Sequence, residues 1–104
     1  MFRVEVADRA RDDADEAFAY LEGAVSPGFA ATWYQGLFEQ VEALARLPAR
    51  CPVAVESRQF ADEIRELIYG KRRHEHRYRT LFSIRDDLVS VLAIQHTARR
   101  EFEP

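Results

Sequence analysis

Residues 88–95 read Leu-Val-Ser-Val-Leu-Ala-Ile-Gln, and this stretch decides the fold because it is apolar at almost every position. A strand with one face in water alternates apolar and polar residues, whereas a strand that is covered on both faces does not. The stretch therefore predicts a central strand. Asp86 and Asp87 precede it and indicate a tight turn from another strand.

Two further strands are predicted upstream of this turn. Residues 77–84 and residues 64–69 are rich in strand-favouring side chains, and Gly70 ends the earlier run. In residues 77–84, Tyr78 and Phe82 fall on one face and Arg79 falls on the other. The C-terminal part is therefore predicted to form three consecutive paired strands.

The N-terminal part is predicted to form one strand and two helices. Residues 2–6 alternate apolar and polar side chains, which is typical of a half-buried strand. From Asp8, which can cap a helix, apolar residues recur every three or four positions. Ser26-Pro27-Gly28 ends this helix and begins a second one, with Ser26 as N-cap and Pro27 at the first helical position. The second helix is expected to reach Leu47 before Pro48 stops it, with Trp33 in the core.

The predicted order is β-α-α-β-β-β, so the fold class is α+β, with a helical hairpin packed on a small, mainly antiparallel sheet. Residues 48–61 contain two prolines and no sustained period, and we expect an ordered connector there with a short strand near residues 53–56. A chain of 104 residues with 47% apolar composition is expected to form a single domain, residues 1–104.

Charge and cysteine content exclude several classes of protein. The net charge of −3 argues against a protein that coats nucleic acid with its whole surface. Residues 1–47 hold four arginines against nine acidic residues, and residues 48–104 hold eleven basic residues against nine acidic ones. Cys51 is the single cysteine and cannot form an intramolecular disulfide. With no apolar run of roughly 20 residues, we expect no membrane segment and a cytoplasmic location.

Arginine and histidine side chains in the C-terminal part are the candidates for chemistry. Arg65 and Arg79 lie on neighbouring predicted strands and can converge on one surface of the sheet, where guanidinium groups would bind phosphate or carboxylate. His96 ends the most apolar strand and can move protons near neutral pH. The pattern places Arg79 and His96 at exposed positions. The alternative is that these charges are solvated or paired with nearby glutamates (Glu63, Glu66 and Glu75).

No metal or cofactor site is predicted. His74 and His76 belong to a basic run, residues 71–77, which indicates a solvated hairpin tip, and two histidines without spaced cysteines or carboxylates are a weak metal signal. Phosphate loops, dinucleotide fingerprints and nucleophile elbows are absent from the sequence. Cys51 has no evident activating base and is expected to act as a small buried hydrophobe.

Four segments carry a resemblance to a known family. These are Leu47-Pro48, residues 63–70 (Glu-Ile-Arg-Glu-Leu-Ile-Tyr-Gly), residues 78–82 (Tyr-Arg-Thr-Leu-Phe) and residues 94–99 (Ile-Gln-His-Thr-Ala-Arg). Together with the order of elements, they make the chain resemble the RelE/ParE superfamily over residues 4–99. Members of this superfamily are toxins of type II toxin–antitoxin modules and are also described as plasmid stabilisation proteins.

The resemblance implies a bacterial toxin that arrests growth and is held inactive by a cognate antitoxin. The antitoxin is expected to be a DNA-binding protein, of ribbon-helix-helix type, whose C-terminal segment wraps the toxin, so that operator DNA is bound only through it. A shallow groove between a helical hairpin and a sheet edge can accept an amphipathic helix and an added strand. The fold therefore suits neutralisation by wrapping.

The superfamily divides between ParE-like inhibitors of DNA gyrase and RelE-like mRNA endonucleases that act on the ribosome. The nucleases are usually strongly basic, whereas this chain has a pI near 5.6, no lysines on its second helix, and no tyrosine in the tail after Arg99. These features favour the gyrase inhibitor. A family member that has lost toxicity and only binds antitoxin is a third possibility.

The positions that match functional sites of the superfamily are Arg65, Arg79, His96 and Arg99, with Tyr78 a weaker match. In a RelE-like nuclease the three arginines would hold the scissile phosphate, and His96 would move the proton. In a ParE-like toxin the same segments would contact a protein target.

Overall fold

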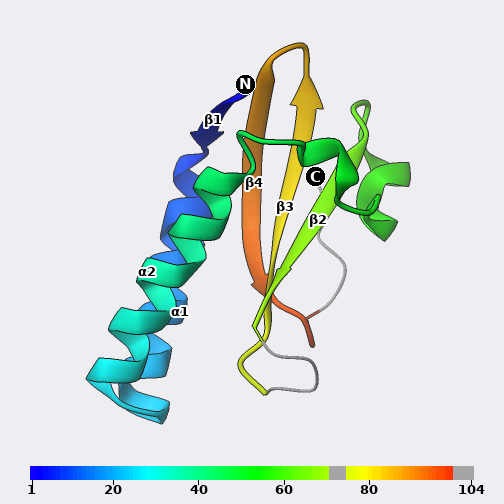
Figure 1. The fold of residues 1–104 in the computed structure, drawn as a ribbon. Coiled ribbons are helices and arrows are strands. Elements are labelled where there is room, and N and C mark those ends of the chain that lie inside the picture. Colours follow the sequence, from blue (N-terminus) through cyan, green and yellow to red (C-terminus); the bar gives the residue numbers. More distant parts are fainter. Residues whose placement is uncertain (71–74, 100–104) are drawn as a thin grey trace.

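The structure of the protein is a computed structural model that describes residues 1–70 and 75–99. Its elements follow the predicted order (Figure 1): β1 (Arg3–Val6), α1 (Asp8–Ala24), α2 (Pro27–Ala43), the 3₁₀ helices η1 (Pro48–Arg50) and η2 (Val55–Gln59), β2 (Ile64–Tyr69), β3 (Tyr78–Arg85) and β4 (Leu88–His96). The α+β fold class is confirmed. No helix in these residues is both long and apolar enough to cross a membrane.

The four strands form one mixed sheet in the order β1-β4-β3-β2. β1 is parallel to β4, and the other pairs are antiparallel. Asp86, with φ of 55°, forms the predicted tight turn between β3 and β4. The register of these two strands shifts between Leu81 and Phe82, because Leu92 is left unpaired as a β-bulge.

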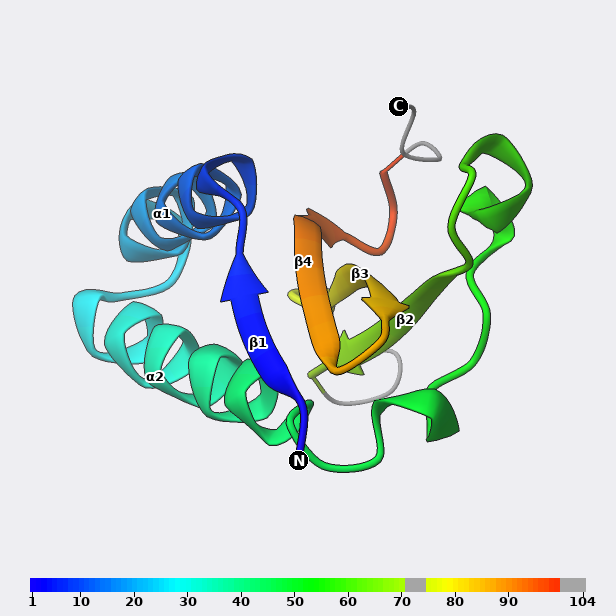
Figure 2. The ribbon, with the colours of Figure 1, turned by 90° about the horizontal axis from the view of Figure 1, so that it is seen from above.

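The central strand β4 is covered on both sides, as predicted. The helical hairpin packs on one face of the sheet, and η2 lies on the opposite side (Figure 2). The main core, on the helix side, includes Leu21, Leu37, Phe82 and Val91, which are buried. A smaller core on the far side contains four buried residues from the connector and three strands (Ala54, Ile64, Leu81 and Ala93).

The helix boundaries follow local sequence signals. Ser26 caps α2 as predicted, because its hydroxyl group accepts a hydrogen bond from the backbone N–H of Phe29 at 3.0 Å. The N-cap of α1 is Ala7 rather than Asp8, so the Asp8 carboxylate lies in the first turn, where the helix dipole favours a negative charge.

Two predictions about the connector were wrong. Residues 53–56 do not form a strand, although Val53 makes an isolated bridge with Arg65 at the outer edge of β2. The second helix does not reach Leu47 as predicted: α2 ends at Ala43, and Leu47 is 69% exposed and left-handed with φ of 49°. Pro48 disfavours the right-handed helical conformation in the residue before it, so α2 cannot continue through Leu47.

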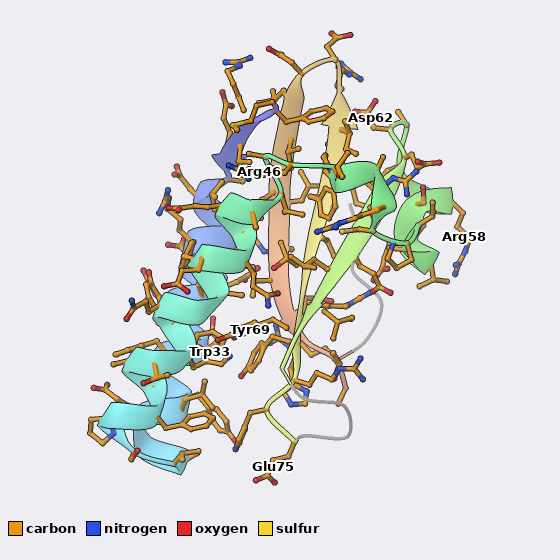
Figure 3. All side chains as sticks on the ribbon, viewed as in Figure 1. Trp33, Arg46, Arg58, Asp62, Tyr69 and Glu75 are labelled. Atoms are coloured by element: carbon orange, nitrogen blue, oxygen red, sulfur yellow. The ribbon has the colours of Figure 1, made fainter. Side chains whose placement is uncertain are left out.

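An aromatic contact joins β2 to α2. Tyr69 reaches toward Trp33 (Figure 3), with 6.3 Å between the ring centroids, and Trp33 is buried as predicted. A Cβ atom at Gly36 would come within 2.1 Å of the Tyr69 hydroxyl oxygen. The absent side chain of Gly36 therefore lets the Tyr69 ring pack against the helix.

Candidate functional site at the end of the sheet

The strand register separates two of the predicted site residues. Arg65 of β2 lies opposite Phe82, which belongs to the helix side of the sheet, whereas Arg79 of β3 lies opposite Ile68 and Gln95 on the far side. Directly opposed residues share a face of an antiparallel sheet. The prediction that Arg65 and Arg79 converge on one surface was therefore wrong.

Arg65 anchors the connector to the sheet. One terminal nitrogen donates hydrogen bonds to the carbonyl oxygens of Ala49 at 2.9 Å and Cys51 at 2.5 Å, and the other donates to the Glu63 carboxylate at 2.6 Å. Ala49 and Cys51 belong to the connector, and Glu63 directly precedes β2. The role that this geometry gives Arg65 is structural.

Arg79 is buried rather than exposed, which corrects the sequence-based expectation. Its side chain is 10% exposed and donates hydrogen bonds to the carboxylates of Glu56 and Glu66 and to the side-chain oxygen of Gln95. Burial lowers the pKa of Arg79, but hydrogen bonds and charge interactions with Glu56 and Glu66 outweigh it and raise this pKa. Arg79 is thus permanently charged and surrounded by partners from its own chain.

Glu56 is the residue of this network that the sequence did not reveal. It lies in η2, is 0% exposed, and faces Arg79 across 23 positions in the chain. No pattern within an irregular connector points to such a distant partner. The alternative interpretation of the sequence, in which the arginines pair with nearby glutamates, correctly named Glu66 as a partner of Arg79 but missed Glu56.

His96 has both ring nitrogens in hydrogen bonds. Its Nδ1 accepts from the backbone N–H of Ala98 at 3.0 Å, and its Nε2 contacts the carbonyl oxygen of Glu75. Because Nδ1 is an acceptor, the ring proton is assigned to Nε2, whose N–H donates a hydrogen bond to the backbone carbonyl oxygen of Glu75. His96 therefore joins the end of β4 to the turn that precedes β3, and its acceptor nitrogen Nδ1 already has a donor.

His76 is not part of a solvated tip. Its side chain is 11% exposed and lies edge-on to Phe29 and Tyr20, with ring centroids 5.8 and 6.5 Å apart. Residues 71–74 of the predicted tip lie outside the described part of the chain.

The single cysteine is not activated. Burial raises the pKa of the Cys51 thiol, although Arg50 and Arg65 act in the opposite direction.

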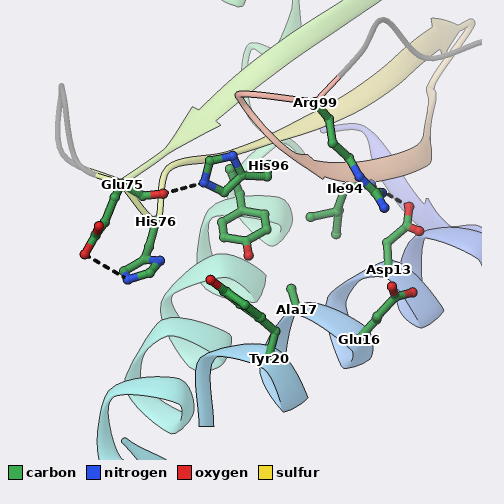
Figure 4. A pocket seen from close by; sticks show the side chains of 10 residues that line it. Asp13, Glu16, Ala17, Tyr20, Glu75, His76, Ile94, His96 and Arg99 are labelled. Atoms are coloured by element: carbon green, nitrogen blue, oxygen red, sulfur yellow. Dashed lines mark hydrogen bonds and ion pairs between the residues drawn. The ribbon is translucent and has the colours of Figure 1, made fainter. Parts of the chain in front are cut away.

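Tyr78, His96 and Arg99 are brought together at one cavity of about 440 Å³ on the helix side (Figure 4). We call it the helix-side cavity. α1 contributes a wall at helical spacing, and the hairpin and the end of β4 contribute the other side; the lining residues are Asp13, Glu16, Ala17, Tyr20, Glu75, His76, Tyr78, Ile94, His96 and Arg99. The spacing of the α1 residues was the signal in the sequence that could have revealed this wall.

A second cavity, of about 450 Å³, lies on the far side of the sheet. We call it the far-side cavity; its lining residues are Val55, Glu66, Ile68, Arg77, Arg79, Thr97 and Arg99. Arg99 lines both cavities and is exposed. The end of β4 therefore separates an acidic hollow from a basic one.

The comparisons with known proteins agree with this fold. Residues 4–101 match the model of the family described as ParE toxin of type II toxin-antitoxin system, parDE. Among solved structures, one described as the chromosomal ParDE TA system from P. aeruginosa superposes with a TM-score of 0.70 at 17% identity, over 92% of this chain and 96% of that chain. At this identity the likeness establishes the fold alone. No curated protein matches the sequence.

Proposed function

The chain belongs to the ParE toxin family of type II toxin–antitoxin systems, and from this premise we propose that it arrests bacterial growth by binding DNA gyrase and is neutralised by a cognate antitoxin in the cytoplasm. The proposal concerns a toxin that acts through protein contact. A RelE-like nuclease would need groups that are free to act on a phosphodiester.

The environment of Arg79 is the observation that carries the proposal. A phosphate-binding arginine must present its guanidinium to the substrate, but that of Arg79 already meets Glu56, Glu66 and Gln95. Two carboxylates beside it would also repel a phosphate. Replacing these partners with RNA would leave the buried Glu56 carboxylate without this cation, which is costly.

His96 supports the same conclusion. A general base needs an unprotonated nitrogen within hydrogen-bond reach of the attacking group. The Nδ1 atom of His96 is occupied by the N–H of Ala98. Of the four residues matched to superfamily sites, Arg99 is the one whose exposed side chain remains available for a partner.

The structure also offers surfaces for the proposed antitoxin. The connector bonds to the outer edge of β2 through Ile64 and Glu66, while no strand of the described chain covers the edge from Leu67 to Tyr69. An extended segment can add to such an edge through backbone hydrogen bonds. A helical segment of the antitoxin could lie over the helix-side cavity, between α1 and the end of β4.

The test is controlled expression of the chain in bacteria without antitoxin. We expect growth arrest with relaxed or cleaved DNA, no ribosome-dependent mRNA cleavage, and rescue by the antitoxin encoded beside the gene. mRNA cleavage with normal supercoiling would identify the nuclease instead. Normal growth at full expression would identify a member that only binds antitoxin.

A further inference from the structure

The helix-side cavity has a lining that matches a guanidinium group. We propose that it receives an arginine side chain of the antitoxin, an inference that rests on the proposed function. Nothing in the family match assigns a side chain to this hollow. Charge, two tyrosines and the hydrogen bonds already present in the lining favour a guanidinium group.

The charge of the lining favours a cation. Among the described residues of the lining, Asp13, Glu16 and Glu75 contribute three carboxylates, and Arg99 is the single arginine or lysine. Asp13 accepts a backbone hydrogen bond from Ile94 at 3.0 Å and lies 3.7 Å from Arg9, so its charge is partly compensated. Glu16 is exposed and extends from the same wall of α1 (Figure 4).

Two tyrosines give the cavity the features that distinguish an arginine from a simple cation. Tyr20 is 59% exposed and presents a ring on which a flat guanidinium can stack. Tyr78 is 6% exposed and lines the cavity. Its hydroxyl oxygen can accept a hydrogen bond from an entering N–H donor.

An anionic occupant fits the cavity less well. Arg99 could attract a carboxylate, but His96 offers it no free ring nitrogen. His96 has both ring nitrogens in hydrogen bonds, and the Nε2 atom of His76 lies 3.4 Å from the Glu75 carboxylate. A carboxylate would also meet Glu16 and Asp13 across the cavity. The balance of charge therefore selects a basic group.

The place of the cavity connects the basic group to the antitoxin. It opens between α1 and the end of β4, beside Glu75 in the turn that precedes β3 (Figure 4). A helix that crosses this groove can send a long side chain into it while its backbone stays outside. Arginine has the length and the planar donors that this geometry requires.

The first part of the test uses the full chain and a small probe. Nα-acetylarginine amide is titrated into the ¹⁵N-labelled protein, with the neutral analogue Nα-acetylcitrulline amide as control. We expect chemical-shift changes centred on Ala17, Tyr20 and Ile94 with the arginine probe only. Glu16→Gln should weaken this binding about threefold, whereas Glu22→Gln, an exposed position on the same helix outside the cavity, should not.

Equal shifts with citrulline, or no shifts at these positions, would overturn the proposal, as would equally tight binding of Nα-acetyllysine amide. This part requires neither gyrase nor antitoxin, so its failure is separate from failure of the proposed function. The second part is a double-mutant cycle that combines Glu16→Gln with replacement of each antitoxin arginine by glutamine. One arginine should show a coupling of about threefold in affinity, and the absence of any coupling would exclude the antitoxin as the source.

Discussion

Removal of the Arg79 guanidinium should strongly destabilise the fold. Arg79→Ala removes four hydrogen bonds and leaves the fully buried carboxylate of Glu56 without this cation. Breaking a buried ion pair by removing one partner costs about 3–5 kcal/mol. Because small domains are stable by only about 5–15 kcal/mol, we expect a large loss.

The assays are urea unfolding and thermal unfolding, each followed by circular dichroism and by the fluorescence of the buried Trp33. In a domain of this size, each kcal/mol shifts the melting temperature by about 4–8 °C, so Arg79→Ala should melt at least about 10 °C lower. Arg85→Ala is the matched control, because Arg85 is on the same strand and pairs with Asp62, but is 69% exposed. We expect no measurable change for the control.

A second variant separates the charge from the packing. In Arg79→Met/Glu56→Met, neither buried charge remains and the volume is roughly kept, so more than half of the lost stability should return. The reasoning is refuted if Arg79→Ala unfolds within about 1 kcal/mol of the wild type, or if the double variant is no more stable than Arg79→Ala.

Three further predictions test other parts of the structure. Gly36→Ala should displace Tyr69 and lower the urea midpoint, because the new methyl group would overlap the tyrosine hydroxyl. The displacement should change the near-ultraviolet circular dichroism spectrum, and an unchanged spectrum would contradict the packing of Tyr69 on Gly36. Burial raises the pKa of Tyr78, with a smaller contribution from Tyr20, against the opposing effect of Arg99. The folded state thus favours the neutral phenol, so this contribution to stability is present below the ordinary pKa near 10 and is lost as pH rises through the raised value. The urea midpoint of the wild type should therefore fall above about pH 10, and that of Tyr78→Phe should fall less steeply. Equal slopes for the two proteins would count against the burial of this phenol. Arg99→Ala should leave the midpoint unchanged but reduce growth arrest, since the side chain is exposed; full toxicity would remove Arg99 from the interaction surface.

The elements could be predicted because their signals are local. A run of residues that is apolar at almost every position, as in 88–95, has few places to lie except the centre of a sheet. Ser26-Pro27 combines a capping hydroxyl with a residue suited to the first turn of a helix. Those inferences depend on neighbours within a few positions. The structure agrees with the predicted strands and with the start of α2 to within one or two residues, whereas α2 ends at Ala43 rather than at Leu47.

The candidate site was harder to predict because it depends on pairings between distant segments. Alternation shows which residues of one strand share a face, but not which face of the next strand lies beside them, and the register places Arg65 and Arg79 on opposite sides. A basic residue on a strand was therefore expected to be solvated. Glu56, from an irregular connector, makes Arg79 a buried structural residue instead.

The most direct test of the central claim is an assay with purified components. DNA gyrase is incubated with supercoiled and relaxed plasmid and increasing amounts of the chain, while programmed ribosomes receive the same amounts. We expect gyrase supercoiling to be inhibited as the chain reaches the concentration of gyrase, with the mRNA on the ribosomes intact. Unchanged gyrase activity at a large excess of the chain, together with cleavage of the ribosome-bound mRNA, would contradict the account.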